Sequence, residues 1–276
     1  MKIFILTFIS VMTISLHSFA AALSPGAVST ATGGSGRGTT EPVDSVLLNP
    51  AVVAQLSTKF FSANYTPNQW GITISDNGSE ALFPAALSFV KSDVNSFKTQ
   101  QLSLALSYSI KKVFAIGLSV SMLEYDLGNV AFEQKYRQTL GDVGVIYAPS
   151  PVFGIGLVAN KIFSTATDIN EGLQKQKTFG LGAQYTYKEF VRFRFDIESA
   201  PENKTDRLVY MGGMETFMND WIIVRLGYQN NNVLSKNYSS LGLGFNGPQF
   251  GLHYAYISNV VDKSEDKHSI DLGIPF

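Results

Sequence analysis

The chain has 276 residues, of which 45% are hydrophobic and only 16% are charged, and its formal net charge is −1. Soluble domains usually contain about a quarter charged residues, so much of this surface is expected to face something other than water. The near-zero net charge excludes the basic field of a nucleic-acid-binding protein. The absence of cysteine excludes disulfides and a lipid-modified cysteine.

Residues 1–22 are predicted to be a secretory signal peptide. A basic start and an apolar stretch over 3–16 precede small residues at 18–22. The stretch is shorter than the about 20 residues that span a bilayer, and the small residues permit cleavage after Ala20 or Ala22. The alternative is a buried N-terminal helix. No apolar run long enough for a spanning helix follows, so membrane residence would require strands.

Residues 23–58 are rich in Gly, Ser and Thr and do not alternate in polarity. Asn49 is a good helix N-cap and Pro50 fits the first helical position, so a short helix through Gln55 is predicted. The segment is interpreted as a plug inside the remaining fold, and the alternative is a disordered tail. Arg37 is its only basic residue, and a buried arginine requires a carboxylate partner. The candidate partners are Asp196, Glu198, Glu215 and Asp271.

Residues 59–276 fall into segments of about ten residues with alternating polarity, which is typical of a transmembrane antiparallel β-barrel. The all-β fold is expected to have about fourteen strands, an even number, with twelve as the alternative. Predicted strand starts are Lys59, Asn68, Ala85, Lys98, Phe114, Tyr136, Phe153, Lys177, Val191, Arg207, Trp221, Asn237, Gln249 and Lys267.

From the middle of the chain onward the connections support this count because they alternate in length, whereas near the start the presumed periplasmic link 77–84 is longer than the presumed outer hairpin at Thr66-Pro67. Tight ones are expected at 111–112, 148–152, 188–189, 218–220 and 247–248. Longer, polar ones are expected at 127–135, 164–176, 200–206, 231–236 and 260–266. Outer-membrane barrels have short periplasmic turns and longer external loops, with aromatic girdles at both interfaces, and aromatic residues here cluster beside the tight turns. The alternative is a soluble β-sandwich, which also alternates.

The last predicted strand has an apolar face formed by Ile270, Leu272 and Ile274 and ends on Phe276. This pattern resembles the terminal strand of bacterial outer-membrane barrels, which the barrel-assembly machinery recognises. The resemblance implies that this machinery is a partner, together with outer-membrane lipid and lipopolysaccharide. The expected location is therefore the bacterial outer membrane.

Four charges lie on one face of a single predicted strand, at Arg192, Arg194, Asp196 and Glu198. Charges on the inner face of a barrel either line a polar lumen or pair with one another, because buried charges are tolerated mainly in pairs. The predicted partners for such pairing are Glu215, Arg225 and Asp271.

The sequence predicts neither an enzyme nor a cofactor. No spacing of His, Asp and Glu suggests a metal site, and no glycine-rich loop has the ending of a phosphate-binding motif. His253 and Ser240 are both predicted to face inward on neighbouring strands, which is the one arrangement that resembles a nucleophile with its base. A structural role for His253 in the lumen is the preferred interpretation.

The segment before the first strand contains, in order, Gly34-Ser35-Gly36-Arg37, Glu41-Pro42 and Asn49-Pro50-Ala51. This order resembles the N-terminal hatch of the long-chain fatty acid transporter superfamily, FadL and its toluene-transporter relatives. The resemblance implies a fourteen-strand barrel with a plug that moves hydrophobic compounds across the outer membrane. It also implies a lateral exit at an inward kink of the third strand, and Pro84 is the residue that would produce it. The long loops and inserts of that superfamily are absent from this sequence.

Two functions are therefore expected as alternatives. In the first, the barrel lets a small hydrophobic ligand, fatty-acid-like or aromatic, cross the outer membrane past the plug. In the second, it is a structural or interaction barrel with an occluded lumen and no transport. An open porin is a weaker third interpretation, because the plug would obstruct the pore.

Overall fold

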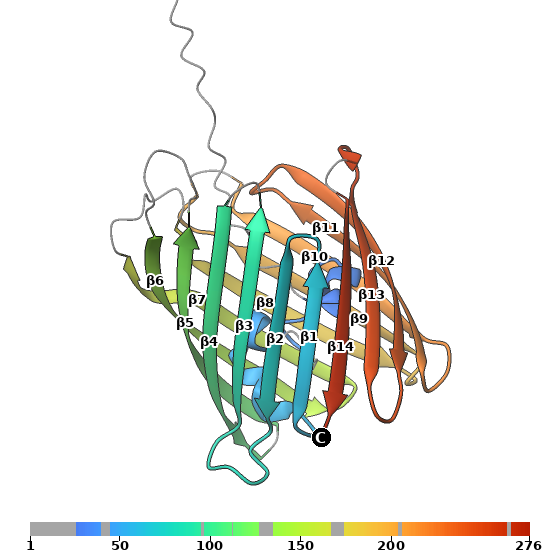
Figure 1. Ribbon diagram of the computed structural model, residues 1–276. Helices are drawn as coiled ribbons and strands as arrows, with labels where there is room; N and C mark the ends of the chain where they lie inside the picture. Colours follow the sequence, from blue (N-terminus) through green and yellow to red (C-terminus); the bar gives the residue numbers. More distant parts are fainter. Residues whose placement is uncertain are drawn as a thin grey trace, which may run out of the picture.

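The computed structural model describes residues 26–39, 45–94, 97–111, 113–126, 135–166, 174–203, 206–263 and 266–276. Its strands form a closed antiparallel barrel in which chain neighbours pair and β1 also pairs with β14 (Figure 1). The predicted all-β barrel of fourteen strands is confirmed, and the twelve-strand alternative is wrong. The predicted signal peptide lies outside the described residues.

The strands begin within two residues of the predicted starts. They are β1 (Phe60–Thr66), β2 (Gln69–Asp76), β3 (Ala85–Val94), β4 (Phe97–Ile110), β5 (Phe114–Asp126), β6 (Lys135–Ser150), β7 (Phe153–Ala166), β8 (Thr178–Tyr187), β9 (Val191–Ser199), β10 (Leu208–Phe217), β11 (Ile222–Asn231), β12 (Lys236–Asn246), β13 (Gly251–Asn259) and β14 (Lys267–Pro275). The predicted and observed starts agree because successive side chains of a strand point to opposite faces of the wall. The resulting alternation of apolar and polar residues is the pattern that predicted the strands.

The wall places large apolar side chains outside and small or polar ones inside. On β4, Leu104 and Leu106 are each 47% exposed, whereas Ser103 is 2% and Ala105 0% exposed. In a soluble sandwich the leucine face would be covered by a second sheet. Here the sheet closes on itself instead, so the β-sandwich alternative is wrong.

Connection lengths distinguish the two ends of the barrel. The turn end, with the short connections, carries 111–113, 151–152, 188–190, 218–221 and 247–250. The loop end carries the longer connections 200–207 and 260–266, among others. The rule fails near the start of the chain, where the connection 77–84 at the turn end is long and the connection 67–68 at the loop end has two residues. The chain terminus also lies at the turn end (Figure 1).

The ring closes through the last strand. Ile270, Leu272 and Ile274 of β14 pair in register with residues of β1, and Ile270 is 44% exposed on the outer face. The backbone N–H of Phe276 donates to the carbonyl of Lys59 at 3.1 Å. The apolar face predicted for this strand is therefore the outer face of the seam.

A segment before β1 lies inside the barrel (blue in Figure 1). This N-terminal segment, residues 26–39 and 45–58, contains α1 (Ala27–Ala31), α2 (Ser45–Leu48) and the 3₁₀-helix η1 (Pro50–Gln55). Helix α1 contacts β11 to β14, and η1 contacts β3 to β6. The short helix predicted after Asn49 is confirmed, although its hydrogen bonding is of the 3₁₀ type.

Candidate functional site

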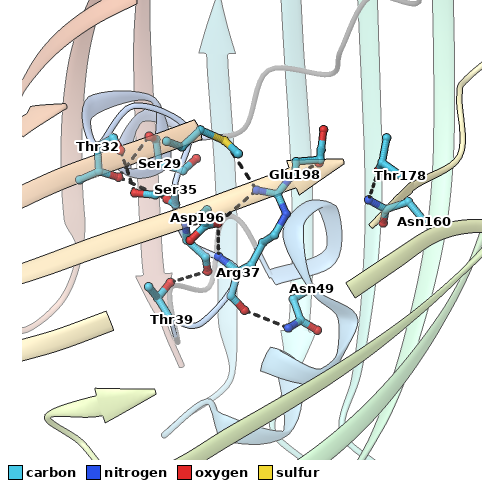
Figure 2. Close-up of polar contacts among 12 residues, drawn as sticks. Ser29, Thr32, Ser35, Arg37, Thr39, Asn49, Asn160, Thr178, Asp196 and Glu198 are labelled. Carbon is cyan, nitrogen blue, oxygen red and sulfur yellow. Dashed lines mark hydrogen bonds and ion pairs between the residues drawn. The ribbon is translucent and has the colours of Figure 1, made fainter. Parts of the chain in front are cut away.

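The lumen holds the charges predicted on β9, and Arg37 of the N-terminal segment lies against two of them (Figure 2). Nη1 of Arg37 is 3.1 Å from Oδ2 of Asp196, and Nη2 contacts the carboxylate of Glu198. The backbone N–H groups of Gly36 and Arg37 donate to the same Asp196 oxygen at 3.0 Å each. One buried carboxylate thus accepts three bonds from the segment, and bonds to an ionised acceptor are the stronger kind.

The two carboxylates compensate the buried positive charge of Arg37. Burial lowers the pKa of Arg37, but Glu198 and Asp196 together raise it by more, so its pKa lies above the usual value. The guanidinium, whose side chain is only 7% exposed, thus carries its charge beside two carboxylates that favour it. Of the four candidate partners, Asp196 and Glu198 contact Arg37, whereas Glu215 and Asp271 contact other groups.

Glu215 on β10 is fully buried and lies among three arginines. Oε1 is 2.6 Å from Nη2 of Arg194 and 3.5 Å from Nη1 of Arg192, while Oε2 accepts from Nε of Arg225 at 2.9 Å. The register places Glu215 directly opposite Arg192 on β9 and Arg225 on β11. Cross-strand neighbours of opposite charge stabilise each other, so this cluster joins three adjacent strands.

Asp271 and His253 extend the polar interior toward the seam. Asp271 is fully buried and accepts a hydrogen bond from the backbone N–H of Ala27 at the start of α1. It therefore holds the N-terminal segment rather than the arginines of β9. His253 lies opposite Asp271 in the register, and its Nδ1 is 3.2 Å from Nη1 of Arg225. Because arginine can only donate, Nδ1 is the acceptor of this bond.

The structure does not bring Ser240 and His253 together. The hydroxyl of Ser240 donates to the carbonyl of Ala31 at 3.2 Å. In the register Ser240 lies opposite Ile257, whereas His253 lies opposite Gly244. No group of three His, Cys, Asp or Glu residues suited to a metal occurs among the described residues. Over that same part of the chain, no helix is long and apolar enough to cross a membrane.

Asn49 connects three parts of the interior. Its Oδ1 accepts from the N–H of Ala51 at 3.0 Å, which is the predicted N-cap bond, and Pro50 occupies the first helical position. Its Nδ2 donates to the carbonyl of Arg37 at 2.9 Å (Figure 2). The same nitrogen donates to the carbonyl of Val145 on β6 at 3.1 Å. Asn49, Pro50 and Ala51 are all buried, so this one side chain ties η1 to the Arg37 region and to the wall.

Glycines in the wall leave room for the backbone of the segment. A Cβ added to Gly117 would lie 2.3 Å from the Ala51 nitrogen, and one on Gly213 would lie 2.4 Å from Cβ of Thr32. A Cβ added to Gly144 would lie 2.0 Å from Oδ1 of Asn49, and one added to Gly156 would lie 2.0 Å from the carbonyl oxygen of Arg37. We call Gly117, Gly144, Gly156 and Gly213 the glycine seat. Sequence reasoning missed it, although the signal was present as glycine at inward positions of several strands.

Pro84, where a lateral opening was expected, lies just before the paired part of β3. Pairing of β3 with both neighbouring strands begins at its residue Ala85. It runs to Ser92 of β3 in the ladder with β2 and to Val94 of β3 in the ladder with β4. Pro84 precedes the first pair, and its carbonyl accepts from the N–H of Ser107 at 3.0 Å. Because its missing N–H falls outside the ladder, the proline does not interrupt the pairing of β3, and the lateral opening at Pro84 stays a prediction.

The register shifts instead between β6 and β7. One shift follows Gly141, where Lys161 has a φ of 55°. There the Lys161 N–H donates to Oδ1 of Asp142 at 2.8 Å. A side chain thus replaces a missing ladder partner, as is common at β-bulges.

No protein-family profile and no curated protein sequence matches the chain. Solved structures match its fold. The toluene transporter TbuX of Ralstonia pickettii has a TM-score of 0.69 at 11% identity, covering 92% of this chain and 99% of that one. The P. putida toluene transporter TodX has a TM-score of 0.68 at 11% identity, with the same coverage of both chains. A Pseudomonas aeruginosa FadL homologue has a TM-score of 0.60 at 10% identity, covering 91% and 98%. The fold of the chain is therefore that of the FadL-like toluene transporters, as its N-terminal motifs predicted.

Proposed function

We propose that the chain forms an outer-membrane channel for small hydrophobic molecules, fatty-acid-like or aromatic, and that it is not an enzyme. The observation that carries the proposal is the combined fold: a closed barrel of fourteen strands with an N-terminal segment bound in its lumen. The structures that share it are named toluene transporters and a monoaromatic hydrocarbon channel. None of these names describes an enzyme.

The outer face supports a membrane location. Exposed leucine, isoleucine and aromatic side chains cover it, including Leu118, Leu157 and Phe193, which are 57%, 53% and 49% exposed. A barrel satisfies its backbone hydrogen bonds internally, which is what a bilayer demands. Export would use the signal peptide in residues 1–22, and insertion would use the barrel-assembly machinery. Outer-membrane lipid and lipopolysaccharide would then surround the wall.

In this proposal the N-terminal segment acts as a plug. Its fixed points are the Arg37 ion pairs, the Asn49 bonds and the glycine seat. A hydrophobic molecule is expected to pass beside these fixed points, because displacing the whole segment would remove Arg37 from Asp196 and Glu198 and break both ion pairs. Local movement is therefore the favoured route to an open path.

The second candidate is a structural or interaction barrel without transport. The close packing of the segment favours it, since Ala51, Val53 and Asn49 are fully buried. A lumen held shut by ion pairs and hydrogen bonds would make a rigid scaffold that presents its loops. The two functions make opposite predictions for uptake.

The test is uptake of two labelled probes, toluene and a long-chain fatty acid, by cells that express the protein and by cells with the empty vector. The amount of barrel in the outer membrane is measured in each culture. Uptake that exceeds the empty-vector rate in proportion to inserted protein, and that unlabelled probe suppresses, is the expected result. Equal uptake at normal insertion would assign the chain to the structural class.

A further inference from the structure

The inner face of β4 is polar along almost its whole length. Every inward position from Thr99 to Ser109 carries a hydroxyl or an amide, except Ala105. We call this set the hydroxyl column, which consists of Thr99, Gln101, Ser103, Ser107 and Ser109. Four of the five are at least nine-tenths buried, and Ser109 is partly buried. The column runs from the loop end of the barrel to the turn end.

Neighbouring strands extend the column sideways. Nε2 of Gln101 donates to the hydroxyls of Ser103 at 2.8 Å and of Ser121 on β5 at 3.3 Å. The hydroxyls of Ser103 and Ser121 lie 2.8 Å apart. On β2 and β3, the Thr73 hydroxyl donates to that of Ser88 at 3.0 Å. The column is therefore part of a hydroxyl-rich wall over β2 to β5, in which the two cross-strand neighbours of Gln101, Val90 and Leu123, are buried and apolar.

Several oxygens of this wall have no hydrogen-bond partner among the described residues. They are Oε1 of Gln101 and the hydroxyls of Ser75, Ser107 and Ser109, all inaccessible in the closed conformation. Leaving a buried polar atom unsatisfied is unfavourable, and bound water usually supplies the missing partner. Apolar solutes cannot satisfy these atoms. The wall is therefore suited to molecules that form hydrogen bonds.

A single apolar contact interrupts the column. Val53 and Leu56, at the end of η1, pack against Ala86 of β3 and Ala105 of β4, and all four are buried. The unsatisfied oxygen of Gln101 lies on the loop side of Ala105, and that of Ser107 lies on the turn side. A narrow apolar contact excludes water and can act as a gate.

Formal charge is concentrated elsewhere in the lumen. The ion pairs of Arg37 and Glu215 are on β9, β10 and β11, whereas the inward positions of β4 from Thr99 to Ser109 carry no charged residue. An ion that entered the column would lose hydration without meeting an opposite charge. An uncharged polar molecule would exchange hydrogen bonds with water for hydrogen bonds with the hydroxyls.

We propose that the hydroxyl column is a second passage, for water and small uncharged hydroxylated molecules, which η1 closes by packing Val53 and Leu56 on Ala86 and Ala105. This activity goes beyond the proposed passage of hydrophobic molecules and does not depend on it. The two solute classes require different inner surfaces, so either activity can fail while the other persists.

The test uses full-length purified protein in phospholipid vesicles, with glycerol as probe and light scattering as the measure of swelling. Leu56→Ser places a hydroxyl at the apolar contact and is expected to raise the glycerol rate over wild type by roughly tenfold, or about 1.4 kcal/mol of barrier. Adding Ser103→Trp to Leu56→Ser should return the rate to that of wild type, because the indole fills the column. Adding Leu104→Trp instead should leave the raised rate unchanged, because Leu104 is the adjacent, outward residue.

Every variant is first shown to be a folded barrel by its heat-dependent migration on a gel. A Leu56→Ser rate equal to that of wild type would overturn the gate, and insensitivity to Ser103→Trp would overturn the location of the passage. Leu56→Ser vesicles that conduct sodium chloride in proportion to glycerol would overturn the restriction to uncharged solutes. Uptake of labelled toluene by cells is measured separately, so failure of the column is distinguished from failure of the hydrophobic channel.

Discussion

Replacing Arg37 by Glu should release the N-terminal segment from the wall. The substitution removes the partner of Asp196 and Glu198 and puts a third carboxylate beside them. Breaking a buried ion pair by removing one partner costs about 3–5 kcal/mol. Asp196 keeps the backbone N–H donors of Gly36 and residue 37, so the lower limit applies. About 3 kcal/mol corresponds to somewhat over a hundredfold in the docking equilibrium.

The absence of native cysteine makes this equilibrium measurable. Ser35 is fully buried in the segment, so a Ser35→Cys reporter should react slowly with a maleimide in mild detergent. Arg37→Glu should accelerate that labelling by roughly a hundredfold, the change expected in the docking equilibrium. The matched control is Arg137→Glu, which reverses a 68% exposed arginine paired with Glu124 and should change the rate by less than about fivefold. Equal labelling of the reporter with and without Arg37→Glu would refute the anchoring role of Arg37.

Three further predictions use the same reporter or simple fractionation. Gly213→Ala should destabilise segment docking by about 1–3 kcal/mol through overpacking. Its control, Gly212→Ala, should not, because the added Cβ would meet nothing within 3.8 Å. Equal labelling of the reporter in the two variants would count against the glycine seat. Asn49→Ala should lose the N-cap bond and about 1 kcal/mol, seen as faster labelling, and an unchanged rate would show that Asn49 is dispensable. Phe276→Asp should reduce heat-modifiable barrel in outer-membrane fractions, and normal amounts there would dismiss the terminal residue as an assembly signal.

The strands could be predicted because each obeys a local rule. On β5, Leu118 and Val120 alternate with Ser119 and Ser121, and the wall imposes that alternation wherever one face meets lipid and the other meets the lumen. The η1 helix was predictable for a similar reason, since Asn49 and Pro50 satisfy the requirements of a helix start by themselves.

Long-range choices could not be read from such rules. The sequence offered Arg37 four carboxylates, and only the closed barrel places Asp196 and Glu198 beside it while Asp271 meets Ala27. The lateral opening expected at Pro84 stays a prediction, because strand pairing alone does not test it. A proline weakens a strand only where its N–H would have joined the ladder, and pairing starts one residue later, at Ala85.

The glycine seat constrains how any passage can open. At Gly144, Gly156 and Gly213 the wall touches backbone or short side-chain atoms of the segment. The segment therefore cannot slide along the wall without bringing those atoms against positions that have side chains. The energy of such contacts rises steeply with overlap, because packed interiors tolerate little of it. By contrast, Val53 and Leu56 meet the wall through apolar side chains alone, and they lie at the end of η1, beyond its anchor at Asn49. Opening by a small movement of this end breaks no ion pair, which makes the end of η1 the least costly gate in the lumen.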